Sequence, residues 1–179
     1  MPTVRRKLRQ VNVAHPAVDC AALPVQRYDA NATIFLVAGF LGKTNAWDSS
    51  EPQASLLRVQ QITRMQAAGI RFGSHSLTHR SLRTLSEPEA RAELTDAKDK
   101  LESILAQPVL TFAHPYNHNN WKTRALARKG GYQAAVLGRG MVNAPWTSPW
   151  ALRRILIHVE TTLEELRHRL DSWRWLRGF

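Results

Sequence analysis

The chain has 179 residues, of which 44% are hydrophobic and 22% charged, and these near-average proportions exclude wholesale disorder, a collagen-like repeat and a coiled coil. One domain of this length can fold without a disulfide or a structural metal, and the single cysteine, Cys20, excludes an internal disulfide. Lys and Arg total 25 against 14 Asp and Glu, so the net charge is +11, which would suit an anionic partner.

Apolar segments follow strand and helix patterns in turn along the first half of the chain. Residues 32–38 are rich in β-branched and aromatic side chains, so they predict a buried strand. Residues 56–65 carry apolar side chains at helical spacing and predict a helix. The next apolar piece, 70–73, predicts a second strand, and Ser86 with Glu89 forms a capping-box pattern that starts a second helix.

The same alternation continues through the second half of the chain. Strands are predicted at 109–113, 132–137 and 154–158, and helices at 120–129 and after Thr162. Strands that alternate with helices indicate a parallel sheet with helical crossovers, either an open α/β sheet or a barrel. In both architectures ligands bind at the carboxyl ends of the strands.

A histidine pair follows the second predicted strand. His75 and His79 come directly after residues 70–73, and side chains four residues apart share one face of a helical turn. Two imidazoles on one face can hold a divalent metal ion, although Ser76 stands where the HExxH metalloprotease pattern has glutamate. Two histidines four residues apart also occur often by chance. The prediction of a metal site therefore depends on their position at the carboxyl end of a predicted strand.

Two further histidine-bearing segments lie at the same predicted edge. Residues 111–118, TFAHPYNH, follow the third strand, and the last strand ends in His158. An exposed turn is the alternative interpretation of the first segment, and a structural histidine is the alternative for the second. If all three loops face one pocket, they form a candidate active site.

Taken in order, these motifs resemble those of the polysaccharide deacetylase family, the NodB homology domain of carbohydrate esterase family four. Residues 32–48 resemble its second-strand region, 72–82 its His-[Ser/Thr]-x-x-His metal motif, 111–118 its third motif around Pro-Tyr, and 153–166 the end of the domain. The similarity is ordered over roughly residues 22–170. We therefore divide the chain into a divergent segment, 1–21, and a deacetylase-like domain, 22–179.

The resemblance implies a fold and a reaction. The fold is α/β, a distorted or incomplete parallel (β/α) barrel, and the reaction is metal-dependent hydrolysis of a non-peptide C–N bond that removes acetyl groups from N-acetylated polysaccharide or oligosaccharide. The implied cofactor is a divalent metal, zinc first, with cobalt or nickel as alternatives, and His75 and His79 are its implied ligands. Tyr116 would donate its backbone N–H to the oxyanion, and His158 would be the general acid.

The implied substrate-binding residues are Pro115 of the third motif and two tryptophans in or near loops, Trp47 and Trp121. Trp146 and Trp150 are similar candidates. An indole ring can stack on the face of a sugar, and for each tryptophan the alternative is packing against the rim of the barrel.

The first motif of the family, Thr-Phe-Asp-Asp, is absent although it should supply the general base and a metal ligand. The stretch in its place, 11–16, carries no acid, and Ala113 stands where many members have an arginine. Three explanations stay open: a truncated or frame-shifted N-terminus, a degenerate homologue that is inactive and binds carbohydrate, or substitution by another acid such as Asp19 or Asp48. We favour the first, because the similarity begins abruptly.

The basic charge has a separate interpretation. No Asp or Glu lies between Ser103 and Val159, so a nucleic-acid-binding protein is a distant alternative. The sequence has no zinc-finger spacing or RNA-stacking signature, so we predict no specific nucleic-acid partner.

The longest apolar run, 32–40, falls short of the roughly 18 residues that span a bilayer. We expect no transmembrane segment and a cytoplasmic protein, with export possible if the true N-terminus is missing.

Overall fold

The computed structural model of the chain describes residues 8–11, 31–49, 52–138, 143–157 and 161–171. Within these ranges it has one sheet of six parallel strands whose order in space equals their order in the chain. The strands are β1 (Leu8–Val11), β2 (Asn31–Leu36), β3 (Arg71–Ser74), β4 (Thr111–Ala113), β5 (Ala134–Leu137) and β6 (Leu152–Arg153).

Each crossover therefore moves to the next strand in the same direction, as in the wall of a (β/α) barrel. Among the described residues no strand joins β6 to β1, so the described part of the barrel is open, in agreement with the expected distorted or incomplete barrel. The elements after the sheet strands are α2 (Val59–Ala67), α3 (Glu87–Leu105), α4 (Trp121–Lys129) and α5 (Leu163–Asp171), with short 3-10 turns η2 (Ala38–Phe40), η3 (Pro115–Asn117) and η4 (Pro149–Ala151).

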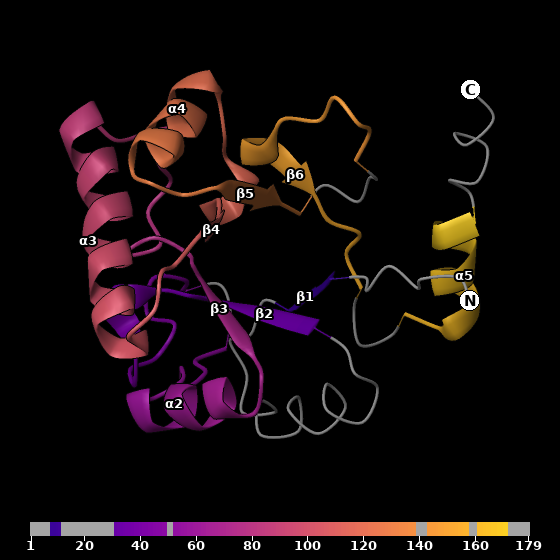
Figure 1. The fold of residues 1–179 in the computed structure, drawn as a ribbon, viewed down its shortest axis with the longest axis horizontal. Coiled ribbons are helices and arrows are strands. Elements are labelled where there is room, and N and C mark those ends of the chain that lie inside the picture. Colours follow the sequence, from indigo (N-terminus) through magenta and orange to yellow (C-terminus); the bar gives the residue numbers. More distant parts are fainter. Residues whose placement is uncertain (1–7, 12–30, 50–51, 139–142, 158–160, 172–179) are drawn as a thin grey trace.

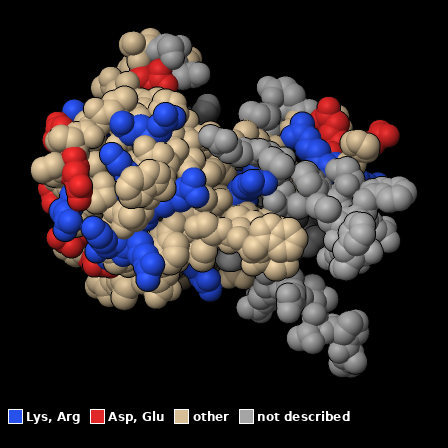
Figure 2. Space-filling view, turned by 90° about the horizontal axis from the view of Figure 1, so that it is seen from above, with Lys and Arg blue, Asp and Glu red and all other residues tan. Residues whose placement is uncertain are grey.

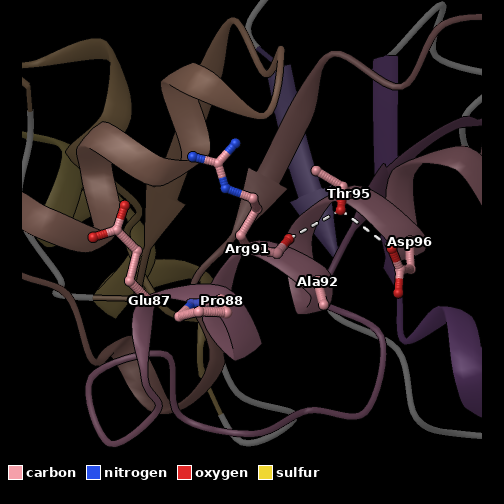
Figure 3. Close-up of a pocket in the computed structure, with 6 residues that line it drawn as sticks. All are labelled: Glu87, Pro88, Arg91, Ala92, Thr95 and Asp96. Atoms are coloured by element: carbon pink, nitrogen blue, oxygen red, sulfur yellow. Dashed lines mark hydrogen bonds between the residues drawn. The ribbon is translucent and has the colours of Figure 1, made fainter.

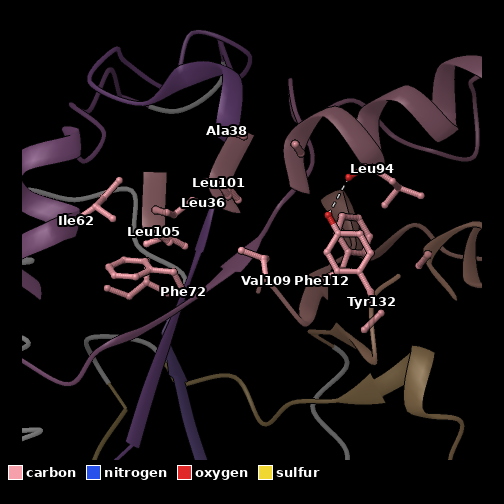
Figure 4. Close-up of a cluster of buried hydrophobic side chains, with 14 of the residues drawn as sticks. Leu36, Ala38, Ile62, Phe72, Leu94, Leu101, Leu105, Val109, Phe112 and Tyr132 are labelled. Atoms are coloured by element: carbon pink, nitrogen blue, oxygen red, sulfur yellow. Dashed lines mark hydrogen bonds between the residues drawn. The ribbon is translucent and has the colours of Figure 1, made fainter. Parts of the chain in front are cut away.

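Helices α2, α3 and α4 line one side of the sheet (Figure 1). Because side chains of a strand alternate between its faces, Ile34 and Leu36 of β2 point to this side and join a large apolar cluster. Ile62 of α2, Leu101 of α3 and Phe112 of β4 belong to the same cluster (Figure 4). This helix-covered face is the main hydrophobic core of the described residues.

The opposite face of the sheet is the inner face of the barrel, and its cluster is small. Phe35 of β2 packs there with Ala113 and Val136, and Leu152 adds to them. Gly73 of β3 also belongs to this face, because a Cβ atom on it would lie 2.6 Å from the Phe35 ring. The inner face thus requires glycine at the position two residues before His75.

The predicted helix caps are present. The backbone N–H of Ser86 donates to the Glu89 carboxylate at 3.0 Å, and Thr162 and Glu165 cap α5 in the same way. Asn120 caps α4 by accepting a hydrogen bond from the Thr123 N–H. Because these capping bonds join residues only three positions apart, the starts of these helices can be predicted from the sequence.

The prediction for the last strand is wrong in position, because β6 covers Leu152–Arg153 rather than 154–158. Its partner β5 ends at Leu137, whose carbonyl accepts the last ladder bond, from the Arg154 N–H at 2.9 Å. Beyond that bond β5 offers no further partner, so residues 155–157 do not extend the strand.

Before β2 the structure has β1, which pairs in parallel with β2 from Leu8 opposite Asn31 to Val11 opposite Ile34. The stretch predicted for the first motif, 11–16, overlaps β1 only at Val11, and the remainder lies outside the described residues. None of the helices in the described ranges combines the length and apolar character needed to cross a bilayer.

Candidate active site at the carboxyl edge of the sheet

The loops after β2, β3 and β4 meet at the carboxyl edge of the sheet. His75 directly follows β3, and its N–H donates to the Leu36 carbonyl at 2.8 Å, which continues the ladder with β2. The Nε2 atoms of His75 and His79 are 3.2 Å apart, and their rings are nearly perpendicular at 84°. The structure thus brings the two predicted metal ligands together.

The pair meets in an irregular loop and not on the helical turn that the spacing suggests. Ser76 and His79 both have positive φ values, 68° and 65°. The Ser76 side chain is fully buried, and its hydroxyl oxygen accepts a hydrogen bond from the His79 N–H at 2.9 Å. Two left-handed residues, rather than helical periodicity, turn the imidazoles toward each other.

The protonation of the pair suits metal binding. His75 Nδ1 lies 2.8 Å from the Ala113 carbonyl, which can only accept, so Nδ1 carries the proton and Nε2 keeps its lone pair. Burial, reinforced by the nearby His79, lowers the pKa of His75 to about 3. Burial also lowers the pKa of His79 to about 4. Both rings are therefore neutral at pH 7, the form that binds a metal ion.

The spacing of the two nitrogens also suits one ion. Two imidazole nitrogens at about 2.0–2.1 Å from zinc and about 100° apart would be separated by about 3.2 Å. His75 and His79 therefore fit two positions of a tetrahedral site. No third Cys, His, Asp or Glu completes a metal-binding group within the described part of the chain.

A buried carboxylate behind this loop, Glu93 of α3, holds it in place. Its oxygens accept hydrogen bonds from the Leu77 N–H at 3.0 Å, the Thr78 N–H at 2.8 Å and the Thr78 hydroxyl. Glu93 is not among the residues predicted from the sequence. Its signal was an acid within the apolar stripe of α3, between Ala90 and Leu94, where only a carboxylate with partners is expected.

The third motif forms η3 at the end of β4. Pro115 is buried, and Tyr116 and Asn117 have φ values of 55° and 57°. Asparagine tolerates this region better than most residues, so Asn117 can hold the second left-handed position of the turn. The Tyr116 N–H donates to no other described residue, and the Tyr116 ring lies 4.7 Å from the His79 ring. The Tyr116 side chain therefore packs against the histidine pair, and the turn that carries it holds a backbone donor with no acceptor among the described residues.

The four candidate tryptophans lie in three different settings. The Trp47 ring stacks on His79 with centroids 4.8 Å apart and an interplanar angle of 24°. Trp121 and Trp146 are 73% and 85% exposed, and no described contact joins them to the histidines. Trp150 packs against the helix-covered core and donates its Nε1–H to the Tyr132 carbonyl, so the packing alternative holds for it. His158 lies outside the described residues.

A shallow depression of about 480 Å³ is separate from this edge. It lies along the solvent-facing side of α3 (Figure 3). The side chains that line it are Glu87, Pro88, Arg91, Ala92, Thr95 and Asp96. Since all of them come from one helix and turn away from its buried stripe, the depression is a surface feature.

Charge is distributed unevenly over the surface. In the view from above in Figure 2, Lys and Arg side chains are spread over the face, interspersed with uncharged ones, while Asp and Glu lie toward its margins. Helix α4, within the acid-free stretch 103–159, exposes Lys122, Arg128 and Lys129. The surface there is basic, without a dense cluster that marks a built anion site.

Comparison with known proteins agrees with this geometry. A family model described as polysaccharide deacetylase matches residues 16–135, which begins inside the segment 1–21 that we separated from the domain. YxkH of Bacillus subtilis (strain 168), which is named for the same family, is 26% identical over 137 residues. That alignment covers 76% of this chain and 46% of YxkH, so the chain spans less than half of that relative's length.

Solved structures show the same fold. The deacetylase PplD of Streptococcus pyogenes, solved in complex with acetate, superposes with a TM-score of 0.76 at 23% identity, over 89% of this chain and 68% of PplD. IcaB of Ammonifex degensii gives a TM-score of 0.72 at 20% identity, over 93% of this chain and 71% of IcaB. The histidine and Pro-Tyr loops of this chain meet at one edge of the same kind of barrel. Because the family model matches most of the chain, this protein belongs to the polysaccharide deacetylase family.

Proposed function

We propose that this protein is a metal-dependent hydrolase that removes acetyl groups from N-acetylated sugars in a polysaccharide or oligosaccharide. The observation that carries the proposal is the facing pair of neutral imidazoles, His75 and His79, with Nε2 atoms 3.2 Å apart. On the adjacent turn, Tyr116 has a backbone N–H that donates to no other described residue. An ion-binding pair together with an oxyanion donor is one arrangement that can catalyse amide hydrolysis. Family membership supports the same reaction class.

His75 and His79 would hold the divalent ion, zinc first, with cobalt or nickel as alternatives. When bound, such an ion supplies Lewis acidity toward the acetyl carbonyl and the attacking water. The Ala113 carbonyl fixes the tautomer of His75, and the Glu93 carboxylate fixes the loop that carries His79.

The Tyr116 N–H would donate to the oxyanion that develops when water attacks the acetyl carbon, and a well-aimed donor of this kind contributes about 3–4 kcal/mol. Pro115 and Asn117 shape the turn that exposes this N–H. Trp47 and Trp121 would contact sugar, Trp47 next to His79 and Trp121 further along the rim at the start of α4. His158 would protonate the departing amine, a role that rests on sequence resemblance.

A second candidate is a member of the family that binds carbohydrate without cleaving it. The Thr-Phe-Asp-Asp motif is absent from the sequence, and the described residues supply no third ligand. With two imidazoles alone an ion would bind more weakly, and hydrolysis would lack its base unless another acid provides it.

Acetate release from N-acetylglucosamine oligomers in the presence of Zn2+ or Co2+ separates the two candidates. We expect release that depends on the metal and that is lost in His75→Ala, while His118→Ala, a nearby histidine bonded to Ser81, retains it. Oligomer binding without release would favour the non-cleaving member. Release that survives His75→Ala would overturn the metal site.

A further inference from the structure

We propose that Trp47, in the loop after β2, is a positioning residue that holds the His79 ring in the orientation for metal binding. The inference rests on the proposed function and gives Trp47 a task beyond contact with sugar. A histidine that binds a metal ion normally donates its second ring N–H to a carbonyl or a carboxylate, and that bond fixes the ring. Among the described residues, only one histidine of the pair has such a bond.

The two imidazoles of the pair are held by different contacts. His75 Nδ1 donates to the Ala113 carbonyl at 2.8 Å, which is the usual support of a histidine ligand. His79 Nδ1 is buried and has no hydrogen-bond partner within the described part of the chain. The His79 Nε2 atom faces His75 Nε2 at 3.2 Å, so the His79 ring has the orientation of a ligand without the hydrogen bond that usually keeps it.

Aromatic rings pack on the His79 imidazole instead. The Trp47 ring stacks on it, with centroids 4.8 Å apart and an interplanar angle of 24°. The Tyr116 ring meets it at a steep angle of 74°, with centroids 4.7 Å apart. Because the indole covers a face of the imidazole, rotation of the His79 ring about its Cβ–Cγ bond would drive it into Trp47. The stacked indole therefore restricts the ring as a hydrogen bond would.

The backbone of the histidine loop has separate supports. The His79 N–H donates to the Ser76 hydroxyl oxygen at 2.9 Å, and Glu93 accepts hydrogen bonds from the N–H groups of residues 77 and 78. These bonds place the Cα atom of His79 but leave rotation of its side chain open. The orientation of the imidazole therefore depends on the side chains that pack on it, and Trp47 is the one that lies nearly parallel to it.

Trp47 is itself held, because Asn45 closes its loop. The buried Asn45 side chain accepts a hydrogen bond from the Ala54 N–H at 2.6 Å and donates one to the Pro52 carbonyl at 3.1 Å. The Asn45 carbonyl accepts from the Asp48 N–H at 3.0 Å, which makes a tight turn around Trp47. An amide that bonds to two backbone groups fixes a loop, so the indole projects from a defined position.

The loop after β2 is also fixed against the histidine loop. The Gly39 N–H donates to the Leu77 carbonyl at 2.7 Å, and a Cβ atom on Gly39 would lie 2.6 Å from that carbonyl oxygen. Glycine therefore permits the two loops to approach closely at this point. The next residue, Phe40, places its ring 5.1 Å from the Trp47 ring at an angle of 81°. The indole is thus supported by a loop that is bonded to the loop of its imidazole partner.

A positioning role and a sugar contact predict different losses when Trp47 is removed. If the indole only contacts sugar, its removal raises KM and leaves the affinity for metal unchanged. If the indole orients His79, its removal lowers the affinity for metal, and kcat returns toward the wild-type value when metal is added in excess. Trp47 is half-buried, so both roles are compatible with its place, and the affinity for metal tests the first.

The test measures Zn2+ affinity by calorimetry in the full chain. We expect Trp47→Leu, which keeps apolar bulk but removes the aromatic face, to lower this affinity by about 10-fold or more. Trp47→Phe keeps an aromatic face and should stay within about threefold of wild type. Trp146→Leu is the matched control, because this tryptophan is 85% exposed, and it should bind Zn2+ as the wild type does.

A second measurement needs no variant. In the metal-free wild-type protein, NMR should show nuclear Overhauser contacts between the indole protons of Trp47 and the ring protons of His79, because the stacked rings lie 4.8 Å apart. Their absence would overturn the inference. Circular dichroism of Trp47→Leu should match the wild-type spectrum, so that a loss of Zn2+ affinity is not a loss of fold.

Zn2+ affinity of Trp47→Leu within about threefold of wild type would overturn the inference and leave Trp47 as a sugar contact alone. An equal loss in Trp146→Leu would overturn it as well, because the effect would not be specific to the stacked ring. A wild-type chain that binds no Zn2+ would overturn the proposed function and this inference together. A wild type whose Zn2+ binding depends on Trp47 but that releases no acetate overturns the proposed hydrolysis alone.

Discussion

The two faces of the parallel sheet are built in different ways. The helix-covered face buries long aliphatic and aromatic side chains from β2, β3 and β4 and from α2 and α3, with smaller contributions from β5 and α4. The inner face carries a glycine at position 73 and only a small cluster around Phe35 and Val136. The covered face therefore supplies most of the stability, whereas the shallow inner face leaves room for His75 and its neighbours at the carboxyl edge.

Damage to the covered face should lower stability and leave the site intact. We expect Leu101→Ala, a fully buried residue of α3 in the apolar cluster, to lower the free energy of unfolding by about 2–5 kcal/mol. Denaturant unfolding measures this loss. Calorimetry at a temperature where the variant is still folded should give the wild-type affinity for Zn2+, and a large loss of affinity would show that the two faces are not separable.

Damage to the support of the histidine loop should affect the site more than the fold. Glu93→Ala leaves two backbone N–H groups and the Thr78 hydroxyl without their acceptor. We expect unfolding free energy to fall by about 2–3 kcal/mol and Zn2+ affinity to fall by about 10–100-fold.

Glu93→Gln is the matched control for this change. Its amide oxygen can still accept from both backbone N–H groups, and its amide group can donate to the Thr78 hydroxyl, so a smaller loss is expected. Denaturant unfolding and calorimetry compare the two variants. Equal Zn2+ affinity in Glu93→Ala and wild type would refute the supporting role of Glu93.

A further expected effect is a pH dependence of the metal-free protein. Burial, then His79, lowers the pKa of His75 to about 3, and burial lowers that of His79 to about 4, against about 6.5 in an unfolded chain. As pH falls below about 6.5 the unfolded chain takes up protons that the folded chain does not, so stability decreases.

Urea unfolding between pH 7 and pH 5 measures this decrease, in a range where most carboxylates stay ionised. We expect the free energy of unfolding to decline toward pH 5 and the decline to be shallower in His75→Gln. An identical slope in both proteins would mean that His75 takes up protons as readily in the folded chain as in the unfolded one.

Local patterns were sufficient to predict most of the fold. The alternation of apolar segments located β2 to β5, and the capping boxes at Ser86 and Thr162 located two helix starts. The position of β6 could not be predicted, because it depends on where β5 stops offering hydrogen-bond partners. Register and strand length are set by neighbours that are distant in sequence.

The site was only partly visible in the sequence. The spacing of His75 and His79 marked the pair, but the left-handed loop that joins them and the bonds to Glu93, some 15 residues away, are tertiary features. Trp47 was expected to contact sugar, and its stacking on His79 depends on the closure of its loop by Asn45. Such contacts leave no periodic signal.

The turn at Tyr116 has a consequence for how this site can change over time. Its hydrogen-bond donor belongs to the main chain, so exchange of the side chain does not remove it, with proline the exception because it lacks the N–H and cannot adopt a φ of 55°. A carboxylate, in contrast, is removed by a single amino-acid substitution. A lineage that loses its acids would therefore keep the proposed oxyanion donor, and recovery of the proposed hydrolysis would need new carboxylates for the base and the third metal ligand.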